Sequence, residues 1–197
     1  MQNIQSVSAR LVRALVIAAG GFALVGCVAI KMPPPQASGD NVNALRAANI
    51  VPVKAGNFSV AVGIDPSLDT SLSGLRGSSL EPTSGTFSHY LRDEIVAELK
   101  AAGLYDEASN ASIQAALNES KVDAAIGTGR GSLGAHFTVT RDGKQVFDKS
   151  LRVEASWDSS FIGAVAIPTA AQQYNALYKA LAAKLFADAD FRAALAH

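Results

Sequence analysis

The chain has 197 residues with 17 basic and 17 acidic side chains, so its formal net charge is zero at neutral pH. This balance provides neither the electrostatic footprint of a nucleic-acid-binding protein nor a basic patch for anionic lipid headgroups. The length suits one domain of ordinary size, and the single cysteine excludes a disulfide within the chain. The fold must therefore be held by its apolar core.

The first 26 residues have the parts of a secretory signal. Arg10 and Arg13 precede a short apolar run, no acidic residue occurs before Cys27, and small residues come directly before this cysteine. The apolar run, residues 14–26, is shorter than the about 20 residues that a transmembrane helix needs. We therefore expect residues 1–26 to be a removable signal peptide and the mature chain to begin at Cys27.

Four residues at the expected cleavage site resemble the lipobox of bacterial lipoproteins: Leu24-Val25-Gly26-Cys27. The resemblance implies that a diacylglycerol, with acyl chains such as palmitate, is attached to Cys27 and holds the protein on a membrane facing the periplasm. Val28 stands where an aspartate would resemble an inner-membrane retention signal, so the outer membrane is expected and the inner membrane is the alternative. Two or three acyl chains anchor stably, since each buried CH2 contributes about 0.8 kcal/mol. The competing interpretation is an ordinary signal peptide with a cysteine near the cut.

Composition divides the mature chain into a tether and one domain. Residues 27–49 form the lipidated N-terminus and contain Pro33-Pro34-Pro35, which favours extended polyproline II geometry and predicts a stiff stalk beside the anchor. A ligand for a proline-recognition groove is the alternative. Residues 50–197 are expected to form a single periplasmic α+β domain. Within it, residues 64–84 lack a clear period, which favours disorder or partial order.

Alternating apolar residues predict the strands of the domain. These strands are expected at residues 58–62, 112–118, 133–140 and 145–157. The last two are joined by Asp142-Gly143, a pair that suits a tight hairpin turn. Lys149 falls on the apolar face of the last strand, which predicts either a bulge or a lysine stem that reaches the edge.

Apolar residues three or four positions apart predict two amphipathic helices. The first runs from Thr86 to Gly103, with a solvated face that holds the charged residues Arg92, Asp93, Glu94, Glu98 and Lys100. The second starts at a capping box formed by Thr169 and Gln172 and ends near Phe186. The order of strands and helices predicts an α+β two-layer sandwich: a mixed or mostly antiparallel sheet of about four to five strands, with the two helices packed on one face.

The order of elements, the lipobox and the hairpin entry Gly127-Thr128-Gly129 together resemble the YajG-like small lipoproteins and related uncharacterised proteobacterial lipoproteins. The resemblance covers roughly residues 55–187, and the lipobox is its only sharp motif. It implies an envelope lipoprotein of poorly defined role, and it carries no catalytic residues to this chain.

Residue patterns that support chemistry are few. His89, His136 and His197 lack the spacing of metal ligands, and no Gly-x-Ser-x-Gly nucleophile elbow occurs. The glycines between Gly127 and Gly131 are followed by a predicted strand, which favours a turn or bulge over a phosphate-binding loop. Arg130, at their centre, is expected to be a solvated charge. We therefore expect no cofactor, no metal site and no enzymatic activity.

The apolar run 161–167 allows two interpretations. It is either a buried connector that closes the core between the last strand and the second helix, or an exposed patch for a partner or lipid. In the second case, Trp157, Phe161, Ile162 and Val165 would form the partner-binding surface, with the tryptophan as an anchor.

Two functions follow from these patterns. The first is a non-enzymatic accessory or binding module, anchored through Cys27, that binds an envelope protein of an outer-membrane or transport assembly. The second is a small-ligand or lipid-binding auxiliary lipoprotein of a lipid-transport system, which requires a cavity between the helices and the sheet. Neither involves nucleic acid.

Overall fold

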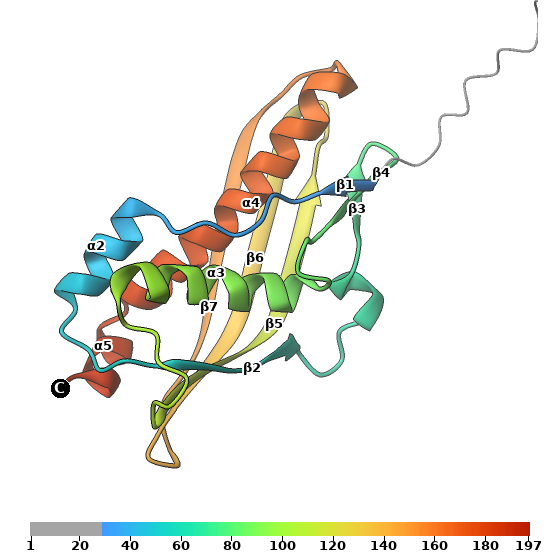
Figure 1. Ribbon diagram of the computed structural model, residues 1–197. Coiled ribbons are helices and arrows are strands. Elements are labelled where there is room, and N and C mark those ends of the chain that lie inside the picture. The colour runs from blue at the N-terminus through green and yellow to red at the C-terminus, as the bar shows by residue number, and fades with distance from the viewer. Residues whose placement is uncertain (1–28) are drawn as a thin grey trace, which may run out of the picture.

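A computed structural model describes residues 29–197 (Figure 1). The predicted signal peptide and the predicted lipidation site at Cys27 lie outside the described residues. In chain order, the elements are β1 (Ala29–Lys31), α2 (Gly39–Ala47), β2 (Lys54–Val60), the 3-10 helix η1 (Pro66–Asp69), β3 (Leu72–Leu75), β4 (Ser78–Glu81), α3 (Phe87–Ala102), β5 (Ala111–Asp123), β6 (Gly127–Arg141), β7 (Lys144–Ser159), α4 (Gly163–Ala187) and α5 (Ala189–Leu195). None of these helices is long and apolar enough to cross a membrane.

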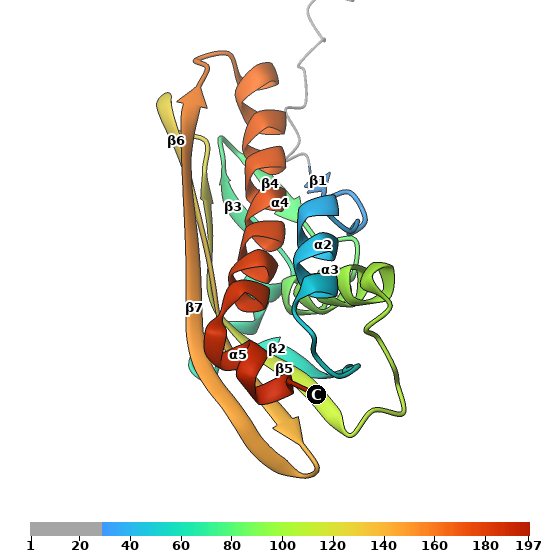
Figure 2. The same cartoon turned by 90° about the vertical axis from the view of Figure 1, so that its left-hand side faces the viewer.

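The predicted α+β class is confirmed. The main sheet has the order β2-β5-β6-β7, in which β2 runs parallel to β5 and the other neighbours are antiparallel. A smaller sheet has the order β1-β4-β3. Figure 2 shows α4 along one face of the main sheet, α2 and α3 beyond it, and the opposite face of β6 and β7 uncovered. The helices α2 and α5 add to the two that the periodicity predicts.

Helix α3 forms as its sequence predicts. The hydroxyl of Thr86 accepts a hydrogen bond from the backbone N–H of His89, and Gly103 ends the helix in the left-handed region with φ 78°. Its apolar stripe is fully buried, including Tyr90 and Ile95. The sequence is sufficient to predict this helix because its capping residues and its apolar period are local signals, in the helix or directly beside it.

Helix α4 begins at Gly163, six residues before the predicted capping box. The hydroxyl of Thr169 donates to the carbonyl of Val165 instead of capping a helix start. Pro168 lies early in the helix, where its missing N–H removes one backbone hydrogen bond. The buried Ala166 and Ala170 extend the apolar stripe toward the start of the helix. Because their side chains are small, the spacing of large apolar residues does not reveal this part of the stripe.

The stalk predicted for residues 27–49 is wrong over its described part. Residues 29–31 form β1, which pairs with β4, and Met32 is buried. The hydroxyl of Tyr90 donates to the carbonyl of Pro33, so the proline segment lies against the helices. Helix α2 then buries Leu45 in the core. The prolines stiffen a segment that belongs to the folded domain.

The disorder favoured for residues 64–84 is also wrong. This segment contains η1, β3 and β4, and its leucines Leu72, Leu75 and Leu80 are buried in the core. The strands β3 and β4 have four residues each, too few to show an alternating pattern. Their order comes from pairing with β1 and packing against β5.

The core lies between the main sheet and the helices. Its largest members include Tyr90, Tyr174 and Tyr178, whose rings pack edge to face. The hydroxyl of Tyr174 shares hydrogen bonds with the hydroxyls of Ser120 and Tyr178, so these buried polar atoms are satisfied. The amine of Lys149 reaches Asp188 and Asp190 from the inner face of β7, which confirms the predicted reach to the edge.

Candidate functional site

Three of the four predicted partner-binding residues lie exposed at one end of the molecule. Phe161 is 76% exposed, Ile162 49% and Val165 52%. Ile126, in the turn between β5 and β6, is 72% exposed and lies at the same end, because its neighbour Gly127 pairs with Ser159 of β7. We call these four exposed side chains, Ile126, Phe161, Ile162 and Val165, the apolar tip.

Trp157, the fourth predicted residue, does not belong to the apolar tip. It is partly buried and packs against the core, with its indole against Gly129 on the neighbouring strand. Its Nε1 atom is buried and has no acceptor in the described part of the chain. The predicted cluster is therefore divided between a packed tryptophan and an exposed tip.

The two interpretations of the apolar run each hold for part of it. Ala166 is fully buried and Ile167 packs against the core, as a connector would. Phe161, Ile162 and Val165 are exposed, as a patch would be. Val165 and Ala166 divide in this way because the start of a helix has one face toward the core and one toward solvent. Phe161 and Ile162, by contrast, lie in the turn before the helix.

Arg76 holds the loop that carries the apolar tip. Its guanidinium donates to the carbonyls of Ala124 at 2.6 Å, Ser160 at 2.6 Å and Phe161 at 3.0 Å, and to the hydroxyl of Ser159 at 3.2 Å. Arg76 lies in the turn between β3 and β4 and has φ 52°. One planar side chain thus ties the small sheet to both turns of the tip.

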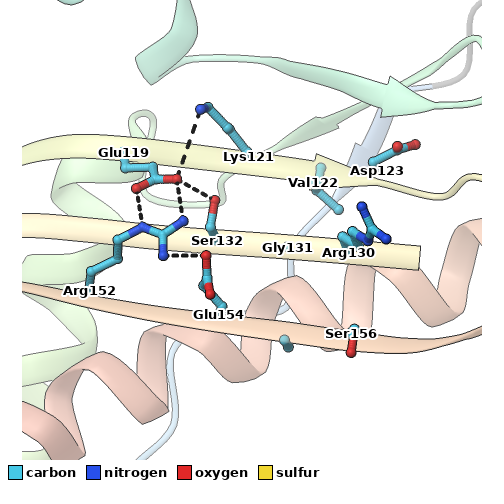
Figure 3. A pocket seen from close by; sticks show the side chains of 11 residues that line it. Glu119, Lys121, Val122, Asp123, Arg130, Gly131, Ser132, Arg152, Glu154 and Ser156 are labelled. Carbon is cyan, nitrogen blue, oxygen red and sulfur yellow. Dashed lines mark hydrogen bonds and ion pairs between the residues drawn. The ribbon is translucent and has the colours of Figure 1, made fainter. Parts of the chain in front are cut away.

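An open groove of about 710 Å³ lies on the uncovered face of the main sheet, near the apolar tip (Figure 3). It is lined by Glu119, Lys121, Val122, Asp123, Arg130, Gly131, Ser132, Arg152, Glu154, Ala155 and Ser156. These residues come from the last part of β5, the first part of β6 and the middle of β7, three strands that run side by side. The charged side chains all lie on the face that no helix covers.

One end of the groove holds a prearranged ion-pair network. The guanidinium of Arg152 donates to both carboxylate oxygens of Glu119 and also pairs with Glu154 (Figure 3). The hydroxyl of Ser132 donates to Glu119 at 2.7 Å. The hydrogen bonds from Arg152, followed by that from Ser132, lower the pKa of Glu119 to about 2, against the effect of its partial burial. Glu119 is therefore ionised at any physiological pH.

The other end of the groove carries Arg130 and Asp123, which are cross-strand partners on β6 and β5. Both side chains are exposed, and the ion pairs found among residues 29–197 include neither. This placement agrees with the expected solvated charge at Arg130. The guanidinium and the carboxylate are both available to a partner with complementary charges.

The glycines around Arg130 serve the sheet. Gly127 takes φ 88° where β6 begins, while Gly129 and Gly131 lie within the strand and face Trp157 and Leu177. A Cβ at Gly129 would clash with the indole. Gly129 and Gly131 thus have a structural role within strand β6.

The three histidines lie on different elements: His89 on α3, His136 on β6 and His197 after α5. His136 pairs through Nε2 with Asp148 at 2.9 Å and through Nδ1 with the hydroxyl of Ser150 at 3.0 Å, all on the uncovered sheet face. Within residues 29–197, no group of three or more potential metal ligands occurs. His136 thus belongs to a surface polar network.

Two carboxylates that the helix pattern places on a solvated face, Glu94 and Glu98 of α3, are in fact fully buried. Glu98 accepts hydrogen bonds from the backbone N–H of Ser38 at 3.0 Å and from the amide of Asn41 at 2.9 Å. Both carboxylate oxygens of Glu94 lack a partner in the described chain. Burial raises the pKa of Glu94 to about 7, opposed by the charge of Lys179 and aided by that of Glu98. The covering segment, residues 33–47, comes from the predicted stalk, so the helix sequence holds no signal of this burial.

Comparisons with known proteins support the fold. No family model and no curated protein matches the chain. The structure is similar to the crystal structure of a DUF330 protein from Xanthomonas campestris, with TM-score 0.55 and 13% identity, covering 81% of this chain and 92% of that one.

Two further similarities are weaker. A proposed lipoprotein from Caulobacter crescentus gives TM-score 0.43 at 13% identity, covering 79% of this chain and 94% of that one. A minor lipoprotein from Acinetobacter baumannii gives TM-score 0.36 at 13% identity, covering 70% and 87%. The Xanthomonas likeness shows a shared fold, and the other two scores add nothing to it.

Proposed function

We propose that this protein is a lipid-anchored envelope lipoprotein that works as a non-enzymatic accessory module, binding a protein of an outer-membrane or transport assembly. The observation that carries the proposal is the open groove on the face of β5, β6 and β7 that no helix covers. Such a face can accept a partner without a change in the domain's own packing.

The groove favours a protein partner because its charges are of both signs and are already oriented. Arg152 and Glu119 satisfy one another, so their desolvation on binding leaves no unpaired charge at that end. At the other end, Arg130 and Asp123 remain for complementary charges. Complementary charges of this kind contribute chiefly to specificity and the rate of association. We therefore expect a partner segment that carries both an acidic and a basic side chain.

The anchor is proposed from the sequence Leu24-Val25-Gly26-Cys27, which resembles a lipobox. Only one residue separates Cys27 from Ala29, the first residue of β1. An acylated Cys27 would thus hold the domain directly at the membrane, with no stalk between them. Val28 favours the outer membrane over the inner membrane.

The alternative, a lipid or ligand carrier, requires a cavity between the helices and the sheet. Tyr90, Tyr174 and Tyr178 fill that space with fully buried rings. The open groove lies instead on the outer face of the sheet. This packing supports the accessory module over the carrier.

Site-specific photo-crosslinking in cells tests the proposal. A photoreactive residue replaces Ser156 in the groove, and the matched control replaces the exposed Gln172 on α4, on the helical side of the sheet. We expect a discrete protein adduct from position 156 that is lost with Arg130→Glu and with the unanchored Cys27→Ser. Equal capture from both positions, or an adduct insensitive to Arg130→Glu, would contradict the groove as the binding surface.

The anchor and the alternative need their own measurements. Mass spectrometry of the mature N-terminus should show acyl chains on Cys27, and Cys27→Ser should leave the membrane fraction. Native mass spectrometry of the gently purified protein should show no bound lipid other than the anchor. A stoichiometric co-purifying lipid would favour the carrier instead.

A further inference from the structure

We infer that the apolar tip inserts into the same membrane leaflet that holds the Cys27 anchor, giving the domain a second attachment point. This inference rests on the proposed lipidation of Cys27. It goes beyond anchoring because it fixes the orientation of the domain on the membrane and names the residues that enter the lipid.

The tip is a concentrated apolar surface. Residues 124–129 and 159–167, the two turns that carry the tip together with the element ends beside them, contain no charged side chain. Of the large apolar side chains that the described chain exposes, four lie at this end: Ile126, Phe161, Ile162 and Val165. Single exposed apolar residues are ordinary on protein surfaces, whereas a cluster of them indicates an interaction site.

The chain enters the domain near this same tip. Ala29 pairs with Ser79 on β4, a strand that starts directly after the Arg76-Gly77 turn. From that turn, Arg76 donates to the carbonyl of Phe161. Figures 1 and 2 show β1 beside the half of α4 that is nearer to the β7–α4 connection, away from α5.

The anchor therefore stays close to β1, in the half of the domain that carries the tip. Two residues of extended chain span at most about 7 Å, so Cys27 stays close to Ala29 whatever its conformation. A lipid on Cys27 brings the leaflet to the end of the domain where the tip projects. Several kinds of partner could cover an apolar surface. The acyl region of the leaflet is the one partner that an acylated Cys27 would always bring near the tip.

The tip is also held in place to meet a surface. Arg76 fixes both turns through four hydrogen bonds to Ala124, Ser159, Ser160 and Phe161. An apolar face at a membrane interface typically enters the headgroup and acyl boundary by about 5–10 Å. Because the tip lacks lysine and arginine, its insertion should not need anionic lipid.

Insertion would stand the main sheet on the membrane. The strands β5, β6 and β7 would run away from the leaflet, with the hairpin turn at Asp142-Gly143 farthest from it. The groove of Glu119 and Arg130 lies in the half of these strands nearest the tip, so its partner would be met close to the membrane surface.

Depth-dependent quenching on vesicles tests the inference with the full-length lipidated protein. An NBD fluorophore is attached to Ile162→Cys, and the matched control carries it on Val146→Cys, an exposed apolar position beside the opposite hairpin. Acylation of Cys27 leaves the introduced cysteine as the only free thiol. The protein is reconstituted into phosphatidylcholine vesicles with and without lipids brominated in their acyl chains.

We expect bromine to quench the fluorophore at position 162 several-fold more than at position 146, equally with and without added phosphatidylglycerol. Phe161→Ser combined with Val165→Ser should reduce the quenching at 162 to the control level, while Val62→Ser should not change it. Circular dichroism checks that each variant is folded.

Three other results would overturn the inference and are distinguishable. Membrane-bound protein without quenching at 162 would leave the anchor intact and refute insertion. Protection of the fluorophore that depends on protein concentration and not on brominated lipid would assign the tip to a second copy. If the purified protein carries no acyl chains on Cys27 and does not sediment with vesicles, both the proposed anchoring and this inference are refuted.

Discussion

Gly129 and Trp157 are cross-strand partners on β6 and β7, and the indole of Trp157 lies directly against the backbone of Gly129. A Cβ on Gly129 would be 2.3 Å from Nε1 and Cε2 of the ring. No real Cβ sits that close to a ring, so only glycine allows the tryptophan its position. This contact explains a glycine within a strand, where glycine is otherwise unfavourable.

Gly129→Ala should lower the free energy of unfolding by about 1–3 kcal/mol, because the added methyl group forces the indole out of its packed position. Urea denaturation followed by tryptophan fluorescence measures it, since Trp157 is the only tryptophan. Gly39→Ala, where a Cβ meets nothing within 4 Å, is the matched control and should be nearly neutral. If both alanine variants have the same stability, the close packing is not present in solution.

Arg76→Ala should destabilise the protein by about 1.5–3 kcal/mol, because four acceptors lose a charged donor. The loss should be local as well, so amide hydrogen exchange should accelerate in residues 159–163. Arg92→Ala is the control, since within residues 29–197 Arg92 pairs only with the adjacent Asp93 at the surface and should contribute less than about 1 kcal/mol. If the amide hydrogen exchange of residues 159–163 is unchanged in Arg76→Ala, Arg76 does not hold this loop in place.

Stability should fall between pH 4.5 and about 7 because of Glu94. Its pKa is raised to about 7 in the folded protein, so in this range the folded state holds a proton that the unfolded state has released. Glu94→Gln mimics the neutral form and should be more stable than the wild type by about 1–3 kcal/mol above pH 8. The difference should disappear below pH 4.5.

The measurement is urea denaturation at a series of pH values, with Glu107→Gln in an exposed loop as the matched control. That control should leave the pH dependence as in the wild type. A Glu94→Gln variant with the wild-type pH profile would mean that Glu94 is ionised in the folded protein, with partners that this structure does not provide.

Glu119→Gln should lower the free energy of unfolding at neutral pH, and this loss should shrink at acidic pH. The pKa of Glu119 is lowered to about 2, so its ion pair with Arg152 contributes fully above pH 4.5 and is lost as the pH falls toward 2. Because Arg152 is about half exposed and solvent screens the pair, the loss at pH 7 should be only about 0.5–1 kcal/mol.

NMR titration of the Glu119 carboxyl gives the pKa directly, and it should rise toward its usual value in Arg152→Ala. Asp123→Asn, in the same groove and without an ion pair in the described chain, is the matched control for stability. A Glu119 carboxyl that titrates near 4.5 in the wild type would show that the network of the groove does not persist in solution.

The sequence by itself determined the features whose signals are local. The start of α3 at Thr86 and its end at Gly103 follow from a hydroxyl cap and a left-handed glycine within the helix. The β6–β7 hairpin follows from Asp142 and Gly143, which take φ 52° and 75°. The alternation on the strands predicted the α+β class, because side-chain period depends only on neighbouring residues.

Tertiary structure decided which of these surfaces are covered, because coverage depends on segments far apart in the chain. The residues after Cys27 pack as β1 and α2, which buries Glu94 and Glu98 under a segment about 60 positions away. The small sheet supplies Arg76 to a loop more than 80 positions later. The exposure of Phe161 and Ile162 beside a buried Ala166 likewise depends on where α4 meets the sheet, a relation between elements that no local pattern of apolar residues contains.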